Sequence, residues 1–390
     1  MAVNRILRKF GLELKRHKPE RHMRRVTIDA EGGKRGTALV AYIVEPFLGD
    51  GKSVNNSHTN HIESVMIVRA LTQLGFEVDV IDYRNANFVP EKPYNLFISA
   101  RTHLARVAQR LNDDCIKIAH LDTAHFLFNN TSAYRRLQDL KDRRGAATHS
   151  LKRIEENWAP ETADYLAILG NDFTLGTYAY ANKPMYPLPV PTPYRYDSPV
   201  DKDFTEIART FLWFGSGGLA HKGLDLVLEA FAELPDFKLI VCGPVEAHFE
   251  RQFVTAYDNE LFHQDNIETI GWVDVSSAEF RELAHRCIGL VYPSASEGQS
   301  GAVVTCMQAG LIPIVSRESG VDVHDFGSVL PDCRLDTLRD VIVRISEETS
   351  ESLKRRAVES WEYARSNHTT DVYLAEYRRM IESILDRQSR

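Results

Sequence analysis

Both halves of the sequence show the same order of elements: a short apolar run, a loop with glycine, and a segment with helical periodicity. In the first half, residues 37–44 are apolar, apolar side chains recur at helical spacing over 62–74, and a second apolar run occupies 77–82. A continuous apolar run bounded by turn residues is typical of a strand buried on both faces of a parallel sheet. Strand, helix and parallel strand in this order form a right-handed crossover, which predicts a doubly wound α/β fold.

The alternation continues along the chain and divides it into two domains. Proline recurs five times over residues 187–199, a density that suits a stiff hinge. The length of 390 residues also favours two domains. We expect further strands at 96–99, 116–120, 165–169, 211–214, 238–242, 288–292 and 312–316. The predicted parts are a leader and linker (1–36), an N-terminal domain (37–195), a C-terminal domain (205–370) and a final helix that packs back on the N-terminal domain (371–390).

Composition excludes several classes of protein. The chain is 43% hydrophobic and 26% charged, as in an ordinary globular protein. Its five cysteines are scattered without a Cys-x-x-Cys pair, which argues against a zinc site or a disulfide framework and favours the cytoplasm. No run of about 18 apolar residues suggests a membrane span. The net charge of −7 argues against nucleic-acid binding by the body of the chain.

The leader differs in charge from the rest. Residues 1–36 hold 11 Lys or Arg against 4 Asp or Glu, so the acidic charge lies in the remainder. Within residues 1–16, apolar side chains recur at three- and four-residue steps between basic ones. One interpretation is an amphipathic helix that attaches the protein to the inner face of an anionic membrane. The other is a helix that packs on the acidic body.

The strongest chemical signal lies in residues 292–316 (YPSASEGQSGAVVTCMQAGLIPIVS). A strand is expected to end here, a loop presents Glu297, and a helix begins near Gly301. Ligands of open α/β sheets bind outside the carboxyl ends of strands, which is where this loop lies. The N–H groups of Ser300, Gly301 and Ala302 face outward at the start of the helix, where they can hold a phosphate.

A second signal lies in residues 211–234 (FLWFGSGGLAHKGLDLVLEAFAEL). Gly217 and Gly218 allow backbone N–H groups to approach phosphate oxygens closely. Lys222 stands at a predicted helix start, where a cation opposes the helix dipole. A bound anion explains that position better than an ordinary exposed lysine does.

These two stretches resemble the donor site of glycosyltransferase family 4, retaining enzymes of the GT-B fold. Glu297 and Gly298 match the start of the family signature, and Gly310 with the following IPIVS matches its end. Two positions depart from the pattern. The second signature Glu falls on Thr305, which has one hydroxyl and cannot hold two ribose oxygens as a carboxylate can. The usual Arg falls on Ser216.

The resemblance implies a fold and a set of roles. It implies two doubly wound Rossmann-like domains that face each other across a cleft, with the nucleotide-sugar donor in the C-terminal domain and the acceptor on the N-terminal side. Glu297 would lie beside the transferred sugar, and a histidine near the end of the 116–120 strand would lie close to the reacting centre. We prefer His125 to His120 for that position, with a structural histidine as the alternative. The remaining implied contacts are the donor diphosphate at Lys222, Gly217, Gly218, Ser300, Gly301 and Ala302, and the nucleoside at Thr305, Gly243 and Val273.

The function implied is transfer of a hexosyl group from a nucleotide-diphosphate sugar to a hydroxyl of a glycan or lipid-linked acceptor, with retention. A degenerate GT-B protein that binds without turnover is a second hypothesis, motivated by Ser216 and Thr305. A GT-B epimerase is a third, and it needs further acid/base carboxylates that the sequence does not locate. We expect no metal or cofactor, since no Asp-x-Asp triplet stands at a strand end and no His/Cys spacing suits zinc.

Overall fold

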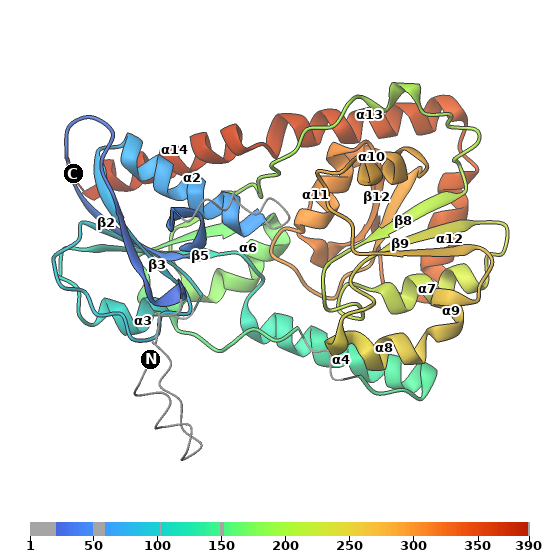
Figure 1. Cartoon of the computed structure of the whole chain (residues 1–390), viewed down its shortest axis with the longest axis horizontal. Coiled ribbons are helices and arrows are strands. Elements are labelled where there is room, and N and C mark those ends of the chain that lie inside the picture. Colours follow the sequence, from blue (N-terminus) through green and yellow to red (C-terminus); the bar gives the residue numbers. More distant parts are fainter. Residues whose placement is uncertain (1–20, 50–58, 102, 149–151, 389–390) are drawn as a thin grey trace, which may run out of the picture.

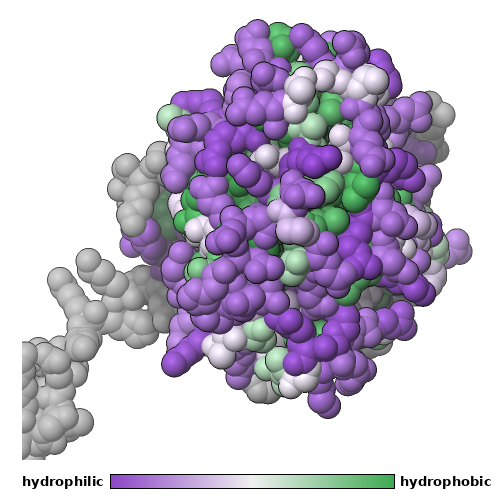
Figure 2. Space-filling view, turned by 90° about the vertical axis from the view of Figure 1, so that its right-hand side faces the viewer, coloured by the Kyte–Doolittle hydropathy of each residue, from purple (hydrophilic) through white to green (hydrophobic). Residues whose placement is uncertain are grey.

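The computed structural model describes residues 21–49, 59–101, 103–148 and 152–388. Two sheets, each covered by helices on both faces, form two lobes side by side along the longest axis of the molecule (Figure 1). The predicted α/β architecture of two Rossmann-like domains is therefore confirmed. The face of the C-terminal lobe seen in Figure 2 is mostly hydrophilic with scattered apolar groups, as is usual for a surface in water.

The N-terminal sheet has seven strands in the order β1-β3-β2-β4-β5-β6-β7. Only β1 is antiparallel, and it pairs with β3 at the edge. The strand bounds are Arg25–Ile28 (β1), Gly36–Tyr42 (β2), Phe76–Asp82 (β3), Leu96–Ala100 (β4), Ile116–Leu121 (β5), Tyr165–Leu169 (β6) and Met185–Leu188 (β7). Strands β2 to β6 fall on the predicted apolar runs, whereas β1 lies in the region assigned to the leader and linker and β7 at the start of the region assigned to the hinge.

The C-terminal sheet has six parallel strands in the order β10-β9-β8-β11-β12-β13. Successive side chains of β8 show why its apolar run is continuous. Phe211 and Trp213 pack in the core on one face, and Leu212 packs in the core on the other. The bounds are Thr210–Phe214 (β8), Lys238–Cys242 (β9), Ile267–Gly271 (β10), Gly289–Tyr292 (β11), Ile312–Ser316 (β12) and Ser328–Leu330 (β13).

The helices connect the parallel strands and cover both sheets. In the N-terminal domain they are Thr59–Gln73 (α2), His103–Ala108 (α3), Phe126–Arg144 (α4), Ala159–Thr162 (α5) and Asp172–Tyr178 (α6). In the rest of the chain they are Leu224–Ala232 (α7), Arg251–Ala256 (α8), Asp258–Phe262 (α9), Ala278–His285 (α10), Gly301–Gln308 (α11), Leu335–Ser346 (α12), Ser350–Asn367 (α13) and Thr370–Gln388 (α14). Among these described helices, none has the length and apolar character that crossing a bilayer requires.

Helix α4 follows β5 of the N-terminal sheet but reaches the C-terminal domain (Figure 1). Leu140 belongs to the apolar core of that domain. Arg136 and Arg143 both pair with the buried Asp225 of α7, at 3.3 and 2.6 Å. Losing either partner would leave a buried charge uncompensated, so these pairs fix the position of α4 on the C-terminal domain.

The C-terminal helix makes the return connection. Helix α13 lies along the C-terminal domain, and α14 continues to the N-terminal domain, where it contacts α2 (Figure 1). Tyr373, Tyr377 and Ile381 are fully buried in the core beneath the N-terminal sheet. The chain thus passes between the domains twice, at the proline-rich segment and again at α13–α14. These two segments are hydrogen-bonded to each other, since the Thr192 N–H donates to the His368 carbonyl at 3.0 Å.

Candidate active site

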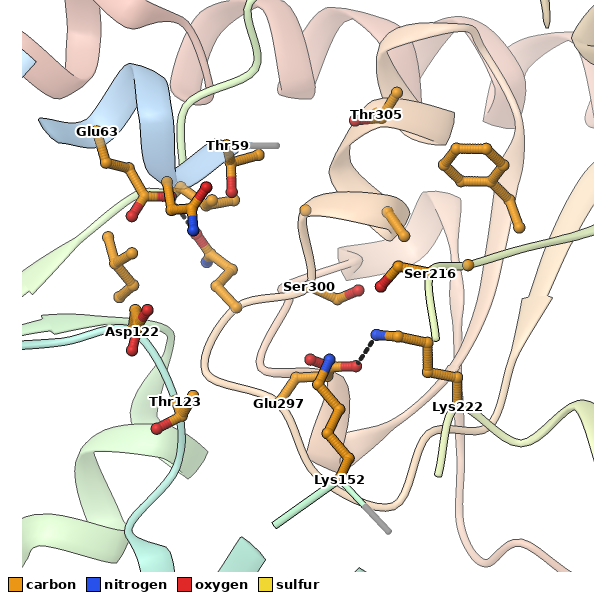
Figure 3. Close-up of a pocket in the computed structure, with 18 of the residues that line it drawn as sticks. Thr59, Glu63, Asp122, Thr123, Lys152, Ser216, Lys222, Glu297, Ser300 and Thr305 are labelled. Carbon is orange, nitrogen blue, oxygen red and sulfur yellow. Dashed lines mark hydrogen bonds and ion pairs between the residues drawn. The ribbon is translucent and has the colours of Figure 1, made fainter. Parts of the chain in front are cut away.

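A cleft of about 280 Å³ lies between the domains, at the carboxyl ends of strands from both sheets (Figure 3). Ligands of doubly wound sheets bind at this edge. Eight of the residues predicted for the donor site line the cleft: Lys222, Gly243, Val273, Glu297, Ser300, Gly301, Ala302 and Thr305. Ser216, where the family places an arginine, lines it as well.

Lys222 and Glu297 form an ion pair in the cleft, with Nζ and Oε1 2.7 Å apart. Tyr292, at the end of β11, holds both: Lys222 Nζ donates to its hydroxyl at 2.8 Å, and the hydroxyl donates to Glu297 Oε1 at 3.0 Å. Burial alone would raise the pKa of Glu297, but the nearby ammonium groups outweigh burial and lower that pKa to about 2. Glu297 is therefore ionised at neutral pH.

The backbone next to Lys222 has no room for a side chain. Gly223 precedes α7 with a φ of +79°, and a Cβ there would lie 2.4 Å from the Pro293 carbonyl oxygen. This close contact between the backbones of Gly223 and Pro293 brings Lys222 against the end of β11 at Tyr292. It explains why glycine follows lysine at this point of the sequence.

Lys152 is a second cation at the cleft, beside Glu297 (Figure 3). Repulsion from Lys222 is the main reason why the pKa of Lys152 is lowered, to about 8. Two ammonium groups facing one carboxylate leave an excess of positive charge here. Sequence reasoning missed Lys152, since it stands in an irregular segment with no motif around it.

The start of α11 also faces the cleft, with Ser300 at the N-cap position. The Ser300 N–H donates to the Ser319 carbonyl at 2.9 Å, and its side chain makes no capping bond. The expectation that the Ser300 amide is free for phosphate is therefore corrected. Gly301 and Ala302 occupy the first turn, where N–H groups have no partner within the helix, so these two remain available to an anion.

Gly217 and Gly218 do not line the cleft, in contrast to the sequence expectation. The Gly218 N–H donates to the carboxylate of Glu250, which is fully buried and also accepts from the Leu219 N–H at 3.2 Å. A Cβ on Gly217 would lie 2.8 Å from the Phe249 ring. The glycines thus allow this loop to close over Glu250, and the Gly218 amide is already occupied.

His125 does not line the cleft either. It is the N-cap residue of α4, where Nδ1 accepts from the Leu127 N–H at 3.3 Å. Its Nε2 lies 3.0 Å from the Tyr180 hydroxyl, in a separate pocket. The expected position of His125 close to the reacting centre is thus corrected, because α4 begins only after the chain has left the cleft.

The N-terminal side of the cleft carries a network that the sequence did not reveal. Asp122, just beyond β5, pairs with Arg101 at 2.9 Å. The Tyr42 hydroxyl donates to Glu63 at 2.7 Å and approaches Asp122 at 3.3 Å. Burial would raise the pKa of Asp122, but Arg101 outweighs burial and lowers it. His120, the residue passed over at the sequence level, is buried behind this network, 3.7 Å from Glu63.

The Glu297 loop of the C-terminal domain is hydrogen-bonded to the N-terminal domain. The Ala124 N–H donates to the Glu297 carbonyl at 3.1 Å, and the Thr174 hydroxyl donates to the Gly298 carbonyl at 2.6 Å. A Cβ on Gly298 would lie 2.5 Å from the Asp122 carbonyl oxygen, so only glycine fits between the domains. Acidic groups of the N-terminal domain consequently lie directly across from the Lys222–Glu297 pair.

No group of three His, Cys, Asp or Glu side chains within the described residues is arranged to hold a metal ion. Charged side chains and the start of α11 line the cleft in the described parts of the chain. Cations dominate on the C-terminal side and paired carboxylates on the N-terminal side.

Comparison with known proteins places this site in context. Residues 208–347 match the family model of glycosyl transferases group 1. Sucrose-phosphate synthase from Thermosynechococcus elongatus superposes with a TM-score of 0.61 and 14% identity, over 90% of this chain and 99% of that one. HepE from Anabaena, solved with UDP-glucose, gives 0.56 and 13% identity, over 89% and 100%. Curated proteins give no match by sequence.

Proposed function

We propose that this chain, whose residues 208–347 match the family model of group 1 glycosyl transferases and whose fold is GT-B, moves a sugar from a nucleoside diphosphate donor to a hydroxyl acceptor. The observation that carries the proposal is the Lys222–Glu297 pair at the cleft, 2.7 Å apart and facing the start of α11. The structure of HepE with UDP-glucose supports a nucleotide sugar as the donor class.

Departure of the nucleoside diphosphate is the step that needs electrostatic help, because negative charge develops on the leaving oxygen. Lys222 and the N–H groups of Gly301 and Ala302 would stabilise that charge, Lys222 from its buried position and the amides through the helix dipole. Glu297 holds Lys222 in place until the diphosphate arrives. It would then face the donor sugar, whose hydroxyl groups can donate hydrogen bonds to the carboxylate.

The nucleoside would lie deeper in the C-terminal domain, against Thr305, Gly243 and Val273. Thr305 is 7% exposed and can offer one hydroxyl to the ribose. We expect Thr305→Glu to tighten nucleotide binding, because a carboxylate accepts from both ribose hydroxyls. Weaker binding by a well-folded Thr305→Glu variant would show that the ribose lies elsewhere.

The acceptor would approach from the N-terminal side, where the ionised Asp122 lines the cleft and its backbone carbonyl packs against Gly298 of the Glu297 loop. Its proposed role is to accept a hydrogen bond from the acceptor hydroxyl. A glycan or lipid-linked hydroxyl as acceptor, and retention at the anomeric carbon, are proposed from the family resemblance.

A nucleotide-sugar epimerase is the second candidate, because Asp122 and Glu63 supply carboxylates that such a reaction needs. Both are held by partners, Arg101 at 2.9 Å from Asp122 and Tyr42 at 2.7 Å from Glu63, which favours binding over proton shuttling. Incubation with UDP-, GDP-, ADP- and dTDP-sugars separates the candidates. Release of a nucleoside diphosphate supports transfer or its hydrolytic side reaction, an isomeric nucleotide sugar supports epimerisation, and binding without product supports the degenerate alternative.

A further inference from the structure

A second pocket, of about 690 Å³, opens on the N-terminal domain beside the start of α4. Aromatic rings form much of its wall: Phe126 and Phe128 on α4, Trp158 before α5 and Tyr180 after α6. Trp158 is 70% exposed and Tyr180 is 53% exposed. Exposed rings gathered in a concave site are characteristic of a surface that binds a ligand.

A chain of hydrogen bonds orients Tyr180 in the wall of the pocket. Since His125 Nδ1 accepts from the Leu127 N–H, the neutral ring carries its proton on Nε2 and donates to the Tyr180 oxygen at 3.0 Å. The Tyr180 hydroxyl donates in turn to Glu161 at 2.6 Å. Burial lowers the pKa of His125, which keeps this neutral form at physiological pH. The relay orients the Tyr180 ring before any ligand arrives.

The pocket adjoins the cleft. A narrow cavity between them is lined by Arg101 and Asp122, which also line the cleft, and by His125 and Asn157, which also line the pocket. The aromatic pocket thus lies next to the side of the cleft where Asp122 stands. The residues that the cavity shares with the cleft and with the pocket all belong to the N-terminal domain.

We propose that the aromatic pocket is an acceptor subsite that binds a pyranose unit of a glycan, one or more residues away from the hydroxyl that reacts. A pyranose ring has apolar C–H faces, which pack on the electron-rich faces of aromatic rings. Its hydroxyl edges require acceptors, and Glu156 and Glu161 line the same pocket. A lipid chain fits less well, because burying these carboxylates against hydrocarbon would be costly.

This proposal rests on the proposed transfer function, and it gives His125 a positioning role through Tyr180. The probes are methyl glucoside, galactoside, mannoside and N-acetylglucosaminide, at millimolar concentration with the full chain. Saturation-transfer NMR should show at least one of them receiving saturation at its ring C–H groups. Trp158→Ala should weaken that binding by about tenfold, as for an aromatic anchor at a binding hot spot, and Trp158→Phe should retain part of it.

Tyr134→Ala is the matched control, because Tyr134 is an aromatic residue with 56% exposure that lies on α4, as Phe126 and Phe128 do, but outside the pocket lining. Tyr180→Phe keeps the ring and removes its hydroxyl, so it should weaken binding less than Trp158→Ala does. Absence of binding by all four probes, or equal binding by the wild type and Trp158→Ala, overturns the subsite. Calorimetry with UDP, GDP, ADP and dTDP on the same proteins tests the donor site separately, and Trp158→Ala should leave that affinity unchanged.

Discussion

Replacing Lys222 by alanine tests the ion pair at the centre of the cleft. In the free protein the change leaves Glu297 with the Tyr292 hydroxyl at 3.0 Å and Lys152 nearby, but without its 2.7 Å cation. Breaking a buried pair on one side costs about 3–5 kcal/mol, because the remaining charge is uncompensated. The Glu297 side chain is 14% exposed, so we expect a loss at the lower end of this range, about 3 kcal/mol.

Loss of the Lys222 ammonium group should change two measurable properties, the melting temperature and the affinity for a nucleoside diphosphate. For domains of this size, 1 kcal/mol shifts Tm by about 2–4 °C, so the Lys222→Ala variant should melt about 6–12 °C below the wild type. Its affinity for a nucleoside diphosphate should also fall, because a hydrogen bond to a charged group contributes about 1.5–3 kcal/mol. That loss corresponds to a Kd about 10- to 150-fold higher by calorimetry.

A double-mutant cycle separates the pair from other effects. Glu297→Gln removes the uncompensated charge, so the Lys222→Ala/Glu297→Gln protein should be more stable than the sum of the single changes predicts, by about 1–3 kcal/mol. Additive losses of stability would show that the two side chains do not interact as described. Unchanged nucleotide affinity in a folded Lys222→Ala variant would refute the diphosphate role.

Three further outcomes follow. Gly298→Ala places a methyl group 2.5 Å from the Asp122 carbonyl and should cost about 1–3 kcal/mol in thermal unfolding, whereas Gly33→Ala, with no atom within 4 Å of its Cβ, should be neutral. Burial lowers the pKa of His103, His221 and His368 to about 4, so the unfolded chain takes up protons at a higher pH than the folded protein does. The stability of the fold should therefore be full above about pH 6.5 and fall progressively toward about pH 4. Melting curves across this range measure the change, and a flat profile would contradict it. The membrane hypothesis concerns residues 1–16, which lie outside the described residues, and co-sedimentation with anionic liposomes should be lost when residues 1–20 are removed but β1 is kept; equal partitioning of both chains would rule it out.

The fold was largely predictable because the buried strands of a parallel sheet are continuous apolar runs. Residues 37–44 and 211–214 carry that signal without help from distant parts of the chain. Strand β1 does not, since Arg25 to Ile28 alternates exposed and half-buried side chains at a sheet edge. The bridging position of α4 was also not predictable, because it depends on Asp225, which lies 82 residues from Arg143 in sequence.

The candidate site also contains some residues that the sequence predicted and others that it did not. Lys222, Glu297 and the start of α11 belong to two local motifs, and each motif is folded by neighbouring residues. Asp122 and Lys152 belong to no motif, and only the packing of two domains brings them to the cleft. His125 illustrates the limit of a local rule: proximity to a strand end in sequence suggested the cleft, but helix α4 starts at this residue and turns it toward Tyr180.

The central claim is that Glu297 faces the donor sugar while Lys222 and the start of α11 face the diphosphate. The most direct test is the turnover of a nucleoside diphosphate sugar by the Glu297→Gln variant, followed as release of the nucleoside diphosphate under single-turnover conditions. Nucleotide affinity of the same variant is measured by calorimetry. We predict that turnover falls by far more than affinity, because the carboxylate contacts the sugar and the transition state. Normal turnover by a folded Glu297→Gln protein would contradict the account.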